Sequence, residues 1–165
     1  MTANTVYVAS YHSTGGHYSA DWDYFSASGV DNAPRTNGYV TGIRFYKSAG
    51  NTGAHVGNLW TSSGILLATA IFTAETASGW NFSSPVAITA KTVYVASYYS
   101  AAGHYSADWD YFLTSGADNA PLHAPADTTA APNGVFAYGN TSVFPGNTHQ
   151  SANYWVDVVF NASPQ

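Results

Sequence analysis

The chain has 165 residues, and only 8% of them are charged, with four Lys and Arg against nine Asp and Glu. Four basic residues are too few for the cationic surface that nucleic acid or an anionic membrane requires, so we expect no nucleic-acid binding. The 45% hydrophobic content excludes an intrinsically disordered chain, and the absence of cysteine excludes disulfides and thiolate metal sites.

Short strands dominate the predicted elements. The first strand is expected at Thr5–His12, followed by a short helix-like stretch at Ala20–Ser28, and a second such stretch is expected at Ala107–Ser115. Further strands are predicted at Tyr39–Lys47, Ile65–Thr73, Val86–Ile88, Thr92–Tyr99, Gly134–Tyr138 and Tyr154–Phe160. Gly and Asn turns separate them, so the pattern predicts an all-β antiparallel sandwich or jelly roll with one or two short helical turns in loops.

An internal repeat is the most specific signal in the sequence. Residues 2–34 recur without gaps at 89–121, at an offset of 87, and the two copies differ at seven of 33 positions. A regular solenoid needs at least three units, so two copies of part of the chain do not make one. We therefore expect residues 1–34 to be a partial repeat of the second half of a module, and residues 35–165 to be the main module.

Several segments resemble one family. VTGIRFYKSAGNTGAHVGNLWTSSGILLATAIFTAETASGW, DNAPLHAP, PNGVFAYG and NYWVDVVF are similar to the bacterial domain of unknown function 4082, over Gly38 to Phe160. The resemblance implies a β-sandwich module that recurs in large secreted or surface proteins, beside carbohydrate-active and adhesion-type domains. It implies no catalytic site. Family members begin with a strand of the type ELGVKF, which is replaced here by the duplicated segment 2–34.

The composition and the start of the chain bear on location. Met1 to Asn4 carries neither a basic nor an apolar run, so we expect no signal peptide in this sequence. No stretch approaches the roughly 18 consecutive apolar residues of a membrane span, so no membrane insertion is expected. Low charge and high Tyr, Thr and Ser content favour a mature or excised part of a protein that is extracellular or on the cell surface.

Enzymatic motifs are missing from the sequence. Glu75 is the only glutamate, which removes a paired-Glu glycosidase arrangement, and no G-x-S-x-G, H-E-x-x-H or P-loop pattern occurs. A triad of Ser106, His104 and Asp108 lacks an implied orienting geometry. We therefore expect a protein that is not an enzyme.

Acidic residues in both copies suggest calcium as the one candidate cofactor. Carboxylate and amide oxygens recur within about ten residues, as calcium requires. The candidate ligands are Asp21, Asp23, Asp31, Asn32, Asp108, Asp110, Asp118 and Asn119. The alternative is structural, because acids favour the first turn of a helix and Asp favours turns.

Aromatic residues in the same loops suggest a second hypothesis. Flat rings flanked by polar groups grip sugar rings in binding modules. The candidate glycan-binding residues are Trp22, Tyr24, His104, Tyr105, Trp109 and Tyr111. The alternative is a small hydrophobic cluster that pins a long loop to the sandwich.

Self-association is the remaining expectation. An apolar strand does not remain unpaired in water, so the duplicated strand either folds back or is exchanged with a neighbouring copy, giving a head-to-tail oligomer or filament. The strand-exchange segment comprises Thr5, Val6, Tyr7, Val8, Ala9, Ser10, Tyr11 and His12. We expect a non-catalytic module for surface structure, adhesion or fibre assembly, with a carbohydrate-binding module that contacts polysaccharide as the alternative.

Overall fold

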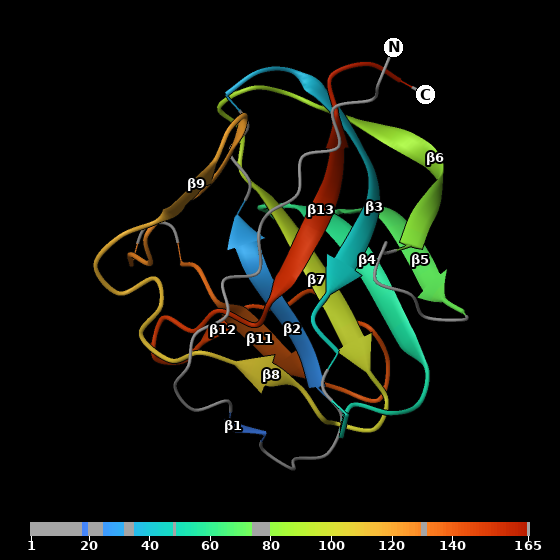
Figure 1. Cartoon of the computed structure of the whole chain (residues 1–165), viewed down its shortest axis with the longest axis vertical. Coiled ribbons are helices and arrows are strands. Elements are labelled where there is room, and N and C mark those ends of the chain that lie inside the picture. Colours follow the sequence, from blue (N-terminus) through green and yellow to red (C-terminus); the bar gives the residue numbers. More distant parts are fainter. Residues whose placement is uncertain are drawn as a thin grey trace.

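The computed structural model describes residues 18–19, 25–31, 35–47, 49–73, 80–129 and 132–164, and within them all regular structure is β-strand. A six-stranded sheet, in the order β12-β11-β2-β7-β4-β5, faces a three-stranded sheet, in the order β13-β3-β6 (Figure 1). The first sheet contains β2 (Phe25–Asp31), β4 (His55–Thr61), β5 (Leu66–Phe72), β7 (Tyr94–Ser100), β11 (Val135–Tyr138) and β12 (Asn147–Thr148). The second contains β3 (Gly38–Phe45), β6 (Trp80–Ile88) and β13 (Val156–Asn161).

Two short pairs of strands lie outside these sheets. β1 (Tyr18–Ser19) pairs with β8 (Ser106–Ala107), and β9 (Ala117–Asn119) pairs with β10 (Leu122–Ala124) as a hairpin beside the sandwich (Figure 1). Every ladder is antiparallel. The predicted all-β antiparallel sandwich is therefore confirmed.

The core lies between the two sheets. In β13 the side chains of Val156, Val158 and Phe160 are buried and alternate with half-buried neighbours, as expected of a strand with one face on a core. They belong to one cluster with Leu59 of β4 and Tyr98 of β7, both fully buried. Burial of such side chains supplies the main favourable term in folding.

Both predicted helix-like stretches are wrong. Residues 25–28 of the first stretch lie in β2, between β11 and β7. The second stretch begins with Ala107 in β8, and its next residues form turns in which the Leu113 N–H donates to the Asp110 carbonyl at 3.2 Å. Stretches as short as these do not form stable helices by themselves, so tertiary pairing decides their conformation.

β2 is the part of the duplicated segment that joins the six-stranded sheet. The predicted strand Thr5–His12 lies outside the described residues. β2 pairs with β7 along its length and with β11 at its start, and the register shifts between Ser28 and Val30. The duplicated segment thus contributes an interior strand to the sheet, and residues 25–31 are part of the sandwich.

An ion pair lies at the outer side of the three-stranded sheet. Arg44 of β3 and Asp157 of β13 are cross-strand partners, and Arg44 Nη2 donates to Asp157 Oδ2. Burial raises the pKa of Asp157, while the neighbouring Arg44 guanidinium and the Val158 N–H lower it. The guanidinium therefore offsets only part of the cost of removing the carboxylate from water, because the pKa stays above its ordinary value.

Replacing this arginine should destabilise the protein in a pH-dependent way. In Arg44→Met the Asp157 carboxylate has no counter-charge, so its pKa rises further above the unfolded value. We expect the free energy of unfolding to fall by about 1–3 kcal/mol at pH 7, because the pair is not fully buried. This loss is present at pH values where Asp157 is ionised in the unfolded chain. It becomes smaller as the pH falls through the raised pKa of Asp157 in the folded protein. Urea unfolding at pH 7 and pH 4.5 measures it, with Lys91→Met, at an exposed position, as control. An equal loss at both pH values would contradict the assignment.

Candidate functional site

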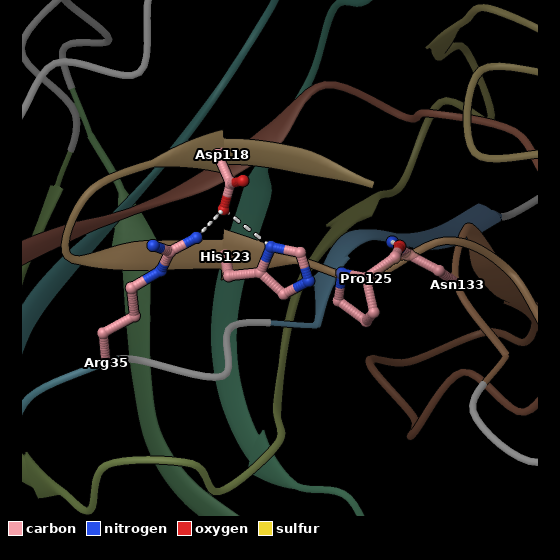
Figure 2. Close-up of polar contacts among 5 residues, drawn as sticks. All are labelled: Arg35, Asp118, His123, Pro125 and Asn133. Atoms are coloured by element: carbon pink, nitrogen blue, oxygen red, sulfur yellow. Dashed lines mark hydrogen bonds and ion pairs between the residues drawn. The ribbon is translucent and has the colours of Figure 1, made fainter. Parts of the chain in front are cut away.

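Three loops meet at one end of the sandwich, and Asp127 holds them together. Its N–H donates to the Phe112 carbonyl at 2.9 Å, and its carboxylate accepts the Asn133 N–H at 3.0 Å and the Ser151 hydroxyl at 2.7 Å. Asn133 Nδ2 in turn donates to the Pro125 carbonyl at 2.6 Å, and Figure 2 shows these two residues near the β9–β10 hairpin. The loops that carry the predicted site residues are therefore held in place by partly buried polar contacts.

Two of the predicted glycan-binding aromatics pack inward. Tyr105 is buried, and its ring lies edge-on to the ring of Tyr154, with 5.8 Å between the ring centroids. Trp109 is half-buried, and its ring lies edge-on to the ring of His149, with 5.5 Å between the centroids. Both belong to or pack on the main core. This packing matches the alternative interpretation, in which aromatic residues pin the loop to the sandwich.

Other predicted glycan-binding residues differ in position. Tyr111 is 40% exposed, and its ring is held edge-on by Phe112 and Trp155. His104 is half-buried. Trp22 and Tyr24 lie outside the described residues. Among the described members of this set, Tyr111 is the one that presents an exposed ring.

The acidic residues do not gather into one cluster. Asp108 exchanges backbone hydrogen bonds with Asn153, and the Asp110 N–H donates to the Gln150 carbonyl at 2.7 Å. Asp118 and Asn119 lie on β9. No three His, Asp or Glu side chains come together as metal ligands in the part of the chain that the structure describes.

Of the candidate calcium ligands in the first copy, the structure describes one. Asp31 ends β2, whereas Asp21, Asp23 and Asn32 lie outside the described residues. Calcium binding therefore stays a prediction, and the described residues give it no geometric support.

Asp118 instead joins a surface cluster with Arg35 and His123. Its Oδ1 accepts a hydrogen bond from Arg35 Nη2 at 2.7 Å and lies 2.7 Å from His123 Nδ1, as Figure 2 shows. The Arg35 N–H also donates to the Pro121 carbonyl at 2.7 Å. The cluster ties the hairpin to the residues that precede β3. Because the Arg35 and Asp118 side chains are 60% and 59% exposed, solvent screens the pair.

The cluster makes Asp118 sensitive to its neighbours. The hydrogen bond from His123 is the largest cause that lowers the pKa of Asp118, and Arg35 adds to it. In His123→Ala the pKa should rise toward the ordinary value for Asp, since the largest stabilising contact of the carboxylate is lost. A lowered folded-state pKa gives stability that is present above the unfolded pKa and lost as the pH falls through the folded one.

An NMR titration of the Asp118 carboxyl carbon measures this change. Asp110 in the same two proteins is the control. An identical Asp118 titration in the parent protein and His123→Ala would contradict the assignment.

Sequence reasoning missed a buried polar cluster beneath the β3–β4 loop. His55 Nε2 lies 2.7 Å from Asn51 Oδ1, and the Ser100 hydroxyl donates to the same oxygen at 2.8 Å. All three residues are fully buried. Asn51 Oδ1 only accepts, so Nε2 is the donor. Ser100 and His55 thus share an acceptor instead of bonding each other, which is not the geometry of an activated nucleophile.

Buried phenols lie near these loops. Burial raises the pKa of Tyr98, Tyr105 and Tyr154, and neighbouring tyrosines add to the rise for each of them. The three phenols stay protonated at neutral pH and pack in the core. They are unsuited to serve as general bases.

The comparisons with known proteins give one match. The sequence model of a family described as "Domain of unknown function (DUF4082)" matches residues 29–156. No curated protein and no solved structure matches the chain. The matched range begins within β2 and ends at the first residue of β13.

Proposed function

Because the chain belongs to the DUF4082 family, whose matched range takes in most of the sandwich, we propose that it is a non-catalytic module of an extracellular or cell-surface protein, in which it serves surface structure, adhesion or fibre assembly. Assembly proceeds by exchange of β2 between neighbouring copies. The observation that carries the proposal is the position of β2 between β7 and β11.

β2 lies in a different sheet from the strand that follows it along the chain. β2 belongs to the six-stranded sheet, and β3 belongs to the three-stranded sheet. The chain contains no cysteine, so only non-covalent interactions hold β2 in place. Exchange of an identical element between copies replaces each lost contact with the same contact from a neighbour, so its energetic cost is low. A head-to-tail exchange that does not close into a ring grows into a filament.

The outer strand of the six-stranded sheet supports association in a second way. Ile65, Leu66 and Ile71 at or in β5 are 63%, 49% and 68% exposed. Residues 61–73 contain no charged residue and no proline, the usual features that protect a sheet edge from pairing. A net charge of −5 over 165 residues also offers little repulsion between copies.

Mixing two single-cysteine chains tests the exchange. Val30 of β2 is opposite Ala96 of β7. A disulfide between Val30→Cys on one chain and Ala96→Cys on another therefore requires the β2 of one chain to lie beside the β7 of the other. After joint incubation at raised temperature and mild oxidation, we expect a disulfide-linked dimer of the two different chains that increases with protein concentration.

The control replaces Ala96→Cys with Ser163→Cys, at an exposed position near the C-terminus. If the Val30 and Ala96 variants yield no more mixed dimer than this control pair, β2 is not exchanged.

Polysaccharide binding is the second candidate function, and the fixed, exposed ring of Tyr111 favours it. Exposed aromatic rings stack on sugar rings. A glycan array tests it: a bound glycan whose signal falls in Tyr111→Ala supports this function. Binding that is unchanged in Tyr111→Ala and Trp109→Ala, or an array without signal, argues against it.

A further inference from the structure

The pairing of β1 with β8 joins the two copies of the repeat to each other. Tyr18 is opposite Ala107, and Ser19 is opposite Ser106. At the offset of 87 that relates the copies, Ser19 and Ser106 are equivalent residues. Residues 16–25 and 103–112 have the same sequence, so β1 and β8 lie in two segments of identical sequence that pair about equivalent serines.

An antiparallel pair that is centred on two equivalent residues has local two-fold symmetry. The same contact is then available to two copies of one segment on two chains, as in an isologous dimer. We propose that β8 of one chain pairs with β8 of a second chain, about Ser106, whenever β1 is displaced. β1 is therefore an intramolecular cap on a dimerisation edge.

The backbone directions around β8 are consistent with this edge. The Asp108 N–H donates to the Asn153 carbonyl at 3.0 Å, and the Asn153 N–H donates to the Asp108 carbonyl at 2.9 Å. Backbone groups of successive strand residues point to opposite edges, so Ala107 directs its N–H and C=O away from Asn153 and toward Tyr18. A second chain in the place of β1 would satisfy the same two groups.

The burial of β8 gives a reason for a cap. Ser106 and Ala107 are 4% and 2% exposed in the structure. An uncovered strand edge presents unpaired N–H and C=O groups and recruits another strand. The contact deepens the proposed assembly function but is separate from the exchange of β2, because it uses different residues and a symmetric geometry.

Single cysteines in the full-length chain test the proposal. Ser19 and Ser106 form the non-hydrogen-bonded pair, whose Cα atoms lie about 4.5 Å apart, within the range that a disulfide accepts. Tyr18→Pro removes the N–H that β1 directs to Ala107 and should displace β1. The chain with Tyr18→Pro and Ser106→Cys should then form a disulfide-linked dimer of twice the 17.4 kDa of one chain.

Two controls define the result. Ser106→Cys with Tyr18 intact should form no disulfide-linked dimer, because β1 covers the edge. Tyr18→Pro with Ser115→Cys, at an exposed serine of the following loop, should also form no disulfide-linked dimer. Equal dimer formation by the Ser106→Cys and Ser115→Cys chains in the Tyr18→Pro background would overturn the proposal.

Two further chains, each with two cysteines, test whether β1 covers β8. Ser19→Cys with Ser106→Cys should form a disulfide within one chain, and Tyr18→Pro should abolish it. An intramolecular disulfide that never forms, or that persists after Tyr18→Pro, also overturns the proposal. Failure of the Val30–Ala96 exchange experiment would leave these outcomes unchanged, so the two ideas are distinguishable.

Discussion

A chain that lacks residues 1–34 should lose its cooperative unfolding transition at 25 °C. The deletion removes β2 and leaves β7 and β11 without the strand that joins them. Each backbone hydrogen bond contributes about 0.5–1.5 kcal/mol net, so the loss of two ladders amounts to about 5 kcal/mol or more. That loss is comparable to the whole stability of a typical domain, about 5–15 kcal/mol. Urea unfolding followed by tryptophan fluorescence measures it.

A shorter truncation is the matched control for this deletion. Removing residues 1–17 leaves both β1 and β2 in the chain, so the transition should be retained. If the chain without residues 1–34 unfolds at the same urea concentration as the full chain, the duplicated segment is dispensable and the account of β2 fails.

Asn51→Ala should give the largest loss of stability among the polar substitutions that the structure singles out. Asn51 Oδ1 is the shared acceptor of His55 Nε2 and the Ser100 hydroxyl, and all three residues are fully buried. Alanine removes the buried acceptor that both donors share. An unsatisfied buried donor costs about 1–3 kcal/mol, so we expect a loss of about 2–5 kcal/mol in the free energy of unfolding.

Two variants serve as comparisons for the stability of Asn51→Ala. Ser100→Ala removes one donor only and should cost less than Asn51→Ala. Thr52→Ala, at the exposed neighbouring position, should change stability by less than about 0.5 kcal/mol. Equal stability of Asn51→Ala and Thr52→Ala would show that the buried polar cluster does not stabilise the loop.

Strand patterns explain how much of the fold is predictable from sequence. The strands predicted at Tyr39–Lys47, Ile65–Thr73 and Tyr154–Phe160 correspond closely to β3, β5 and β13. Each has the regular alternation or β-branched content that a half-buried strand needs. The all-β class follows from such segments and the Gly and Asn turns between them.

β4 was missed because polar residues interrupt its pattern. His55 and Asn58 are buried there, which hydrophobic periodicity does not anticipate. Both are satisfied by partners outside β4: His55 by Asn51 in the preceding loop, and Asn58 by the Ser142 hydroxyl, which is distant in sequence. Asn51 itself lies among Gly and Asn residues that predict only a turn.

The two copies of the repeat show that local sequence alone does not determine which residues form a strand. Phe25–Asp31 forms β2, whereas its equivalent 112–118 begins in turns and reaches a strand only at Ala117. The two stretches differ at three of seven positions, so local preference does not separate them. Their neighbours in the fold do: the first has open ladders of β7 and β11 to join, and the second is tied to the loops around Asp127.

β2 comes from the duplicated segment, completes the six-stranded sheet and is held there by non-covalent contacts. Adding a synthetic peptide of residues 18–37 to the chain that lacks residues 1–34 tests this role of β2. We expect the peptide to restore a cooperative urea transition. The same peptide with Ala27→Pro should not restore it, because Ala27 pairs with both Tyr98 and Phe136. Equal unfolding curves with the two peptides, or no effect of either, would contradict this role.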